Sequence, residues 1–488
     1  MTSGRQFHFP AAQAAATVRH LPPAAELSVT KRPNVIVFFT DQQRFDTTGM
    51  HGNPMGLTPN FDRIAQMGTH VANAFTCQPL CGPSRAALQT GRYATATGVF
   101  RNEITLDPEI PTLGRVFAAN GYRTGYIGKW HLAGEDPVPP GMRGGYEDWL
   151  AANHLEFVSD AYDTRLTDGD GVEHRLPGYR VDALTDAAIR YIGAHKEEPF
   201  LLFISFLEPH HQNHTDDYPA PRGYREELQK RLWTPPDLQT LQGTSSWHLP
   251  GYYGMVKRLD EAFGRLLDAL RSLDLEDDTI VLFTSDHGCH FKTRNDEYKR
   301  SCHESSIRVP MALTGPGFDG GGRVRALVNN TDIAPTLIDA AGIPVPESMQ
   351  GRSILPLLRD PRSDWREETF VQISETETGR AIRTARWKYA VTAPDGADRA
   401  GAAQYEETAL YDLENDPYEL VNLIGMPAFA AVTDGLRVRL LGWISEVERA
   451  NPAITPHPER YQRQHRLSQQ ELLDDYRNGQ VGRGHGGA

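Results

Sequence analysis

The chain has 488 residues, of which 39% are apolar and 23% are charged, and its formal net charge at pH 7 is −13. This length predicts one large globular domain and a smaller second one. An acidic chain repels phosphates, which argues against nucleic acid as a partner. No apolar run reaches the roughly 18 residues of a membrane span. Pro10, Gln13 and Arg19 interrupt the Ala-rich N-terminus, so we expect no signal peptide, no membrane contact and a cytoplasmic location.

Three apolar runs predict buried strands of a parallel sheet, at residues 34–40, 199–206 and 279–284. Each run is followed by polar residues, which begin at Asp41, Glu208 and Ser285 respectively. The carboxyl ends of parallel strands are where open α/β sheets bind ligands. We therefore expect these three polar segments to meet at one site.

Four segments have the apolar spacing of helices, at residues 59–67, 112–120, 181–195 and 255–273, and residues 122–127 form a further predicted strand. Strands that alternate with helices favour right-handed crossovers. The predicted fold is α/β, with a large, mostly parallel sheet between helical layers.

The pattern changes after residue 356. Short strands are predicted at residues 369–374, 381–384, 387–391 and 409–413, followed by a closing helix at 429–449. This pattern predicts a small antiparallel sheet with one helix. The expected organisation is an arm at 1–30, a catalytic domain at 31–356, a C-terminal subdomain at 357–450 and a polar arm at 451–488. The arms are candidates for contacts between copies of the chain.

Four cysteines in a chain of this length do not form a disulfide scaffold. Cys81 begins the run Cys-Gly-Pro-Ser-Arg, which continues through Leu88 to Gly91 and Arg92. Pro83 suits a first helical turn, and a helix N-terminus beside Arg85 forms an anion site that also lowers a cysteine pKa. The short motif alone is equally compatible with a free cysteine that opens an ordinary helix. A zinc site on Cys77 and Cys81 would need two further ligands and is the weaker alternative.

The full run resembles the motif of the type I sulfatases of the alkaline phosphatase superfamily, and the resemblance extends from about residue 32 to residue 422. It implies an alkaline phosphatase-like fold. It also implies that a formylglycine-generating enzyme converts Cys81 to formylglycine. The hydrated aldehyde, and not the thiolate, would then attack the sulfur atom of a sulfate ester.

Oxygen donors for a hard divalent cation stand at Asp41, Gln42 and Asp286, with His287 beside them. The resemblance implies Ca²⁺ at these four residues and residue 81. The family usually has a second Asp where this chain has Gln42, and His287 is a softer ligand than oxygen. Mn²⁺ and Zn²⁺ are therefore alternatives to Ca²⁺.

The remaining catalytic roles are implied by the resemblance. Arg85, Lys129 and Lys299 would stabilise the sulfuryl oxygens together with the metal. His131 would orient the hydrate and act as the base that restores the aldehyde. His210 would protonate the leaving alcohol, with His211 as an adjacent rival for this role.

The segments 210–214 and 287–296 leave two of the predicted strand ends on the same side. They are rich in hydrogen-bond donors and contain a single aromatic residue, Phe291, which favours a sulfated carbohydrate over a simple aryl sulfate. The predicted substrate contacts are His211, His290, Lys292 and Arg294. Both segments could instead be solvated loops away from the substrate.

Three alternatives remain open at this point. A phosphonate monoester or phosphodiester hydrolase would use the same nucleophile, and the Asp41–Gln42 pair slightly favours it. An arylsulfatase with a small aryl substrate would share the whole catalytic set. A sulfatase fold that serves only for binding would be expected to lose matched residues, whereas this chain shows substitutions.

Overall fold

The computed structural model describes residues 32–396 and 399–460, together with residues 470 and 473. The predicted arm at 1–30 and most of the predicted arm at 451–488 lie outside the described residues. No helix in the described part of the chain is long and apolar enough to cross a membrane.

The centre of the molecule is a ten-stranded sheet with the order β12-β2-β11-β9-β1-β8-β4-β5-β6-β7. β1 (Asn34–Thr40) lies between β8 (Phe200–Ser205) and β9 (Thr279–Ser285), and both pairings are parallel. β4 (Arg123–Lys129) pairs in parallel with β8. The predicted α/β fold with a large, mostly parallel sheet is confirmed, and the three predicted strand ends share one edge.

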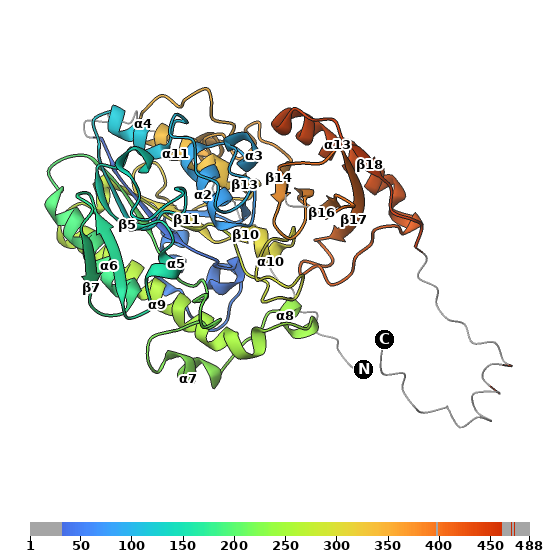
Figure 1. Ribbon diagram of the computed structural model, residues 1–488, viewed down its shortest axis with the longest axis horizontal. Helices are drawn as coiled ribbons and strands as arrows, with labels where there is room; N and C mark the ends of the chain where they lie inside the picture. Colours follow the sequence, from blue (N-terminus) through green and yellow to red (C-terminus); the bar gives the residue numbers. More distant parts are fainter. Residues whose placement is uncertain (1–31, 397–398, 461–469, 471–472, 474–488) are drawn as a thin grey trace, which may run out of the picture.

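Alternate side chains of β1 explain why helices cover both faces of this sheet. Val35, Val37 and Phe39 belong to one apolar cluster, and Ile36 and Phe38 belong to another. The first cluster includes α2 (Cys81–Thr90), α4 (Leu113–Ala119) and α11 (Ile333–Ala340), and the second includes α1 (Pro59–Met67), α6 (Arg180–Ala194) and α9 (Ser245–Ser272). Figure 1 shows the resulting three layers.

α9 begins ten residues before the helix predicted at residue 255, although Pro250 lies inside it. A proline there removes one backbone donor and disfavours helix. Leu249, Tyr252 and Tyr253 are buried in an apolar cluster with Met55 and Leu57. This tertiary packing outweighs the local cost of the proline.

The C-terminal sheet has the order β14-β15-β16-β17-β18 and lies beside the large sheet in Figure 1. Its first four strands are antiparallel, as predicted: β14 (Glu368–Ile373), β15 (Gly379–Thr384), β16 (Trp387–Thr392) and β17 (Gln404–Asp412). β18 (Ala453–Thr455) pairs in parallel with β17, so the sheet continues into the predicted arm at 451–488. The predicted closing helix is α13 (Ala430–Glu448), and its apolar side chains pack with those of this sheet.

The other elements are short, and most were not predicted. The strands are β2 (Thr69–Val71), β3 (Ala74–Phe75), β5 (Asp148–Ala152), β6 (Thr164–Asp168), β7 (Glu173–Leu176), β10 (Arg308–Val309), β11 (Met311–Thr314), β12 (Gly322–Val324) and β13 (Val328–Asn329). The helices are α3 (Ala94–Thr97), α5 (Leu155–Val158), α7 (Tyr224–Gln229), α8 (Pro236–Thr240), α10 (Glu304–Ile307) and α12 (Leu355–Arg359).

Candidate active site

Cys81 is the first residue of α2, and its side chain lies at the carboxyl ends of the central strands. The Ser84 hydroxyl in the same turn donates a hydrogen bond of 2.7 Å to the Asp286 carbonyl, which ties the helix to the end of β9. The Asn102 side chain accepts a hydrogen bond of 3.0 Å from the Gly82 amide. The first turn of α2 is therefore held on both sides.

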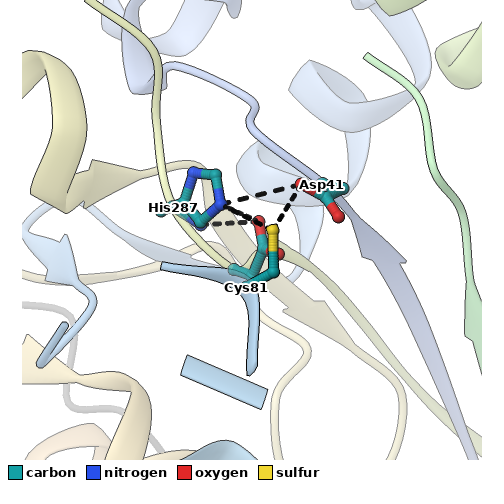
Figure 2. Close-up of side chains that lie close together, drawn as sticks. Asp41, Cys81 and His287 are labelled. Atoms are coloured by element: carbon teal, nitrogen blue, oxygen red, sulfur yellow. Dashed lines mark hydrogen bonds and ion pairs between the residues drawn. The ribbon is translucent and has the colours of Figure 1, made fainter. Parts of the chain in front are cut away.

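Asp41 and His287 follow the ends of β1 and β9 and converge on Cys81, as Figure 2 shows. The Cys81 Sγ lies 3.4 Å from the His287 Nε2 and 3.7 Å from the Asp41 Oδ1. Asp286 completes the group, because one ligand atom from each of the four residues lies within 4.8 Å of the others. These side chains are 0 to 1% exposed. Four of the five predicted metal residues, namely Asp41, Cys81, Asp286 and His287, are thus brought together.

The donor set fits a divalent cation. The His287 Nδ1 lies 2.9 Å from the Gly288 carbonyl, so this nitrogen carries the proton and Nε2 keeps its lone pair toward Asp41 and Cys81. The Gln42 Oε1 is buried without a hydrogen-bond partner, as an amide oxygen reserved for a metal would be. Gln42 also has a φ of 67°, a strained value that is typical of functional sites. Cys77 belongs to the apolar cluster of the C-terminal sheet, and the described metal-ligating groups do not include it.

Two buried cations hold the other oxygen of Asp41. The Arg85 guanidinium and the Lys129 ammonium each lie 2.9 Å from the Asp41 Oδ2. Burial by itself would raise the pKa of Asp41, but Lys129, His210 and Arg85 outweigh it and keep this pKa well below the usual range. For Asp286, burial and the neighbouring Asp41 raise the pKa. A bound cation would favour the ionised form of both carboxyl groups.

Lys299 and His210 lie beside Cys81 and contact each other. The Lys299 Nζ lies 2.9 Å from the Cys81 Sγ and 3.1 Å from the His210 Nε2. The His210 Nδ1 lies 2.7 Å from the His211 carbonyl and therefore carries a proton. His210 Nε2 is thus the acceptor, and the Lys299 ammonium is its donor.

His131 follows β4 and is also buried at the site, with a φ of 60°. Its Nδ1 lies 3.7 Å from the Oε1 of Glu156, a residue that sequence reasoning missed. The same Glu156 oxygen lies 2.9 Å from the Lys129 Nζ. Burial lowers the pKa of His131, but Glu156, Cys81 and Glu103 raise it above the ordinary value overall. Glu156 lies on the one-turn helix α5, which has no motif that marks it as a site residue.

The predicted substrate contacts separate into two groups. His211 is partly exposed and its ring is tilted against that of Tyr298 at a centroid distance of 4.5 Å, and the Lys292 ammonium lies 4.7 Å above the same Tyr298 ring. His290 is completely buried and its Nε2 lies 2.9 Å from the Lys299 carbonyl. The Arg294 guanidinium donates to the carbonyls of Tyr418 and Glu419. His290 and Arg294 were expected to contact the substrate. Their side chains instead contact backbone carbonyls and fix the loop that carries Lys299.

An α/β/α fold with a buried cysteine and a cluster of candidate metal-ligating side chains at the strand ends is the arrangement expected of a hydrolase of the alkaline phosphatase superfamily. A sulfatase family model matches residues 33–343, and a model for the C-terminal part of N-sulphoglucosamine sulphohydrolase matches residues 296–446. The chain belongs to the sulfatase family, and it is an enzyme that hydrolyses sulfate esters.

Individual relatives agree with this assignment. An ulvan-active sulfatase from Formosa agariphila is 32% identical, over 85% of this chain and 82% of its own length. An N-acetylglucosamine-6-O-sulfatase from Bacteroides thetaiotaomicron is 27% identical, over 82% of this chain and 84% of its own length. A structure solved in complex with its substrate D-glucosamine-2-N,6-O-disulfate is 26% identical with a TM-score of 0.71, over 86% of this chain and 99% of that one.

A phosphonate monoester hydrolase from Silicibacter pomeroyi has a TM-score of 0.64 at 22% identity, over 86% of this chain and 96% of that one. At this identity the likeness shows the fold alone.

Proposed function

We propose that this sulfatase acts on a sulfated carbohydrate and uses formylglycine at position 81 and one Ca²⁺ ion. The observation that carries the proposal is the convergence of Asp41, Asp286 and His287 on the Cys81 side chain, with their ligand atoms within 4.8 Å of one another. The Sγ of the unmodified Cys81 stands where the oxygens of a formylglycine hydrate would be. The hydrate would supply a geminal diol as nucleophile and the metal a Lewis acid beside it.

The metal would be held by Asp41, Gln42, Asp286, His287 and the oxygen of residue 81. Three of these side chains offer carboxylate or amide oxygens, which Ca²⁺ prefers. His287 offers one imidazole nitrogen, which suits Mn²⁺ and Zn²⁺ better. Because oxygens are the majority, Ca²⁺ is the proposed ion. Elemental analysis of the purified enzyme tests this choice.

The three cations have different tasks in this proposal. Lys299 lies directly against residue 81 and would bind a sulfuryl oxygen as charge develops on it. Arg85 and Lys129 are already paired with Asp41, so they act mainly by fixing that ligand and adding positive potential. The site therefore attracts an anionic ester within an acidic protein.

Two histidines would move protons. The leaving alcohol would receive its proton from the pair formed by Lys299 and His210, in which Lys299 donates to the His210 Nε2. His131 would accept the proton of the second hydroxyl of the hydrate, and Glu156 would stabilise the imidazolium that forms. Sulfate would leave without attack of water on sulfur.

Conversion of Cys81 requires a formylglycine-generating enzyme as a partner during maturation.

The proposal of a carbohydrate substrate is supported by the named relatives, which act on ulvan or N-acetylglucosamine 6-sulfate, and by the solved complex with a glucosamine disulfate. The Lys292 ammonium is one third exposed and offers a cation beside the partly exposed His211. Lys257, which lies 4.7 Å above the Tyr224 ring, is a matched control cation. Lys292→Ala should slow the desulfation of an oligosaccharide more than that of nitrophenyl sulfate, and Lys257→Ala should slow neither.

Hydrolysis of phosphonate or phosphodiester bonds is the second candidate activity, favoured by the Asp41–Gln42 pair. Steady-state kinetics with the sulfate, phosphodiester and phosphonate esters of nitrophenol separate the two. We expect kcat/KM to be highest for the sulfate ester. A higher value for either phosphorus ester would reverse the assignment.

A further inference from the structure

Two histidines leave neighbouring strands in register beside the active site. β4 and β5 are parallel with Lys129 opposite Ala152, and the pairing continues through hydrogen bonds of 2.9 Å from the Trp130 amide to the Ala152 carbonyl and from the His131 amide to the Asn153 carbonyl. His131 and His154 therefore stand at equivalent positions beyond the two strands. Their ring centroids are 5.0 Å apart.

Each of these rings has a carboxylate on its Nδ1 side. The His131 Nδ1 lies 3.7 Å from the Glu156 Oε1, and the His154 Nδ1 lies 3.9 Å from the Asp136 Oδ2. At these distances the carboxylates favour a positive charge on each ring but form no hydrogen bond to it. The Nε2 atom of each ring lies on the side away from these carboxylates.

A third ligand faces both Nε2 atoms. The Glu103 carboxylate contacts both Nε2 atoms, with Oε1 3.9 Å from the His131 Nε2 and Oε2 3.4 Å from the His154 Nε2. The Glu103, His131 and His154 ligand atoms lie within 4.8 Å of one another. Ligands about 2.0–2.2 Å from a tetrahedral zinc ion are spaced by somewhat more than 3 Å, so a small approach of Glu103 would complete the site. Its side chain is 68% exposed and free to make that approach.

The burial of His131 and the lack of hydrogen bonds to its ring are a second, separate indication of a ligand. Its side chain is 5% exposed, yet neither ring nitrogen has a hydrogen-bond partner. Buried polar atoms of this kind are rare unless something binds them. The side-chain nitrogen of Asn153 lies 3.3 Å from the His154 Nδ1 and 3.4 Å from its Nε2. Because the two distances are nearly equal, Asn153 is not a dedicated hydrogen-bond donor to Nε2.

We propose that Glu103, His131 and His154 form a second metal site that binds Zn²⁺ and thereby inhibits the enzyme. Two imidazole nitrogens and one carboxylate are a zinc ligand set, and water would take the fourth position. Ca²⁺ has little affinity for such a set, so the two sites select different ions. Zinc on the His131 Nε2 would prevent this histidine from accepting a proton. The inhibition rests on the role proposed for His131 above, whereas the binding does not.

Binding is tested in the Cys81→Ala enzyme, which removes the thiolate as a competing zinc ligand. Zinc bound per chain is measured by equilibrium dialysis in excess Ca²⁺. We expect Cys81→Ala combined with Glu103→Gln, or with His154→Gln, to bind one equivalent fewer than Cys81→Ala alone. His174→Gln is the matched control, because His174 forms a surface pair with Asp168 and should leave the number unchanged. Equal zinc binding in all four proteins would overturn the site.

Inhibition is tested in the otherwise unmodified enzyme, with each variant compared with its own zinc-free rate. The zinc concentration for half-inhibition should rise at least about tenfold in Glu103→Gln and His154→Gln, which is a loss of about 1.4 kcal/mol of binding. If these variants bind one zinc equivalent fewer but are half-inhibited at the same zinc concentration, the inhibitory role is wrong and the binding site is retained. A protein with no sulfatase activity would refute the proposed function, and the dialysis result would still decide the zinc site. Because Glu103 is exposed, its variant is not expected to disturb folding.

Discussion

The Lys299 Nζ lies 2.9 Å from the Cys81 Sγ, although the two residues are 218 positions apart in the chain. The His290 Nε2 holds the Lys299 carbonyl at 2.9 Å, and Arg294 connects the same loop to the carbonyls of Tyr418 and Glu419. The geometry at residue 81 therefore depends on contacts that reach the C-terminal part of the chain.

Arg294→Ala should affect all substrates equally. The side chain bonds two backbone carbonyls and holds the loop that carries Lys299, so its loss should reduce turnover of a sulfated oligosaccharide and of nitrophenyl sulfate by the same factor. The loss of two charge-assisted hydrogen bonds should also lower the free energy of unfolding by about 2–4 kcal/mol. Kinetics on both substrates and chemical denaturation measure these effects. A loss confined to the oligosaccharide would restore Arg294 as a substrate contact.

His210→Ala should be sensitive to the leaving group. A general acid matters most when the departing alcohol is a poor leaving group. We expect a loss of about 10²-fold or more in kcat/KM for an alkyl or sugar sulfate and a much smaller loss for nitrophenyl sulfate. His211→Ala serves as the control for the adjacent rival. If His211→Ala shows this dependence and His210→Ala does not, the two assignments must be exchanged.

Glu156→Gln should shift the pH profile to lower pH. Burial lowers the pKa of His131, but Glu156 is the first of the groups that raise it, and the net result lies above the ordinary value of 6.5. A base must be deprotonated to act, so kcat should rise with pH through this raised pKa. Without the Glu156 charge the pKa falls, and the acid limb of the kcat profile should move down in pH. Glu198→Gln, at a surface His195–Glu198 pair of 2.8 Å, should leave the profile unchanged. A profile unmoved by Glu156→Gln would contradict the role of His131 as base.

Asp41→Asn should lose both metal and stability. The substitution leaves the buried Arg85 and Lys129 without the carboxylate that each contacts at 2.9 Å. Breaking a buried ion pair in this way costs about 3–5 kcal/mol of unfolding free energy. The low pKa of Asp41 means that its contribution exists above the ordinary value of 3.8 and fades as pH falls below it. Thermal unfolding and elemental analysis test both effects, with Asp339→Asn on the surface as control. A stable, metal-loaded variant would show that Asp41 is not a ligand.

The parts of the fold that could be predicted are those with a strong local signal. β1, β8 and β9 are continuous apolar runs, and the polar residues after Thr40 and Ser285 mark their shared edge. β7 is a short, exposed edge strand and β6 beside it contains a single apolar residue, Leu166, so no apolar pattern identifies them. The early start of α9 depends on packing of Leu249 and Tyr253, which local propensity at Pro250 opposes.

The site residues also divide into those with a local sequence signal and those placed only by the tertiary fold. Asp41, Cys81, Asp286 and His287 could be placed together because the motif and the strand ends identify them. Glu156 and Glu103 could not, because only the register of β4 and β5 and the path of an irregular loop bring them to His131. Sequence position predicted a substrate contact for His290, whereas its ring is buried and its Nε2 contacts the Lys299 carbonyl.

The central claim, that residue 81 acts as formylglycine, is tested by peptide mass spectrometry together with activity. Preparations made with graded amounts of the formylglycine-generating enzyme should contain graded fractions of a residue 81 in which sulfur and two hydrogens are replaced by one oxygen. We predict that the rate of sulfate release is proportional to this fraction and vanishes in Cys81→Ala and Cys81→Ser. Full activity in a preparation that contains only unmodified Cys81 would contradict the account.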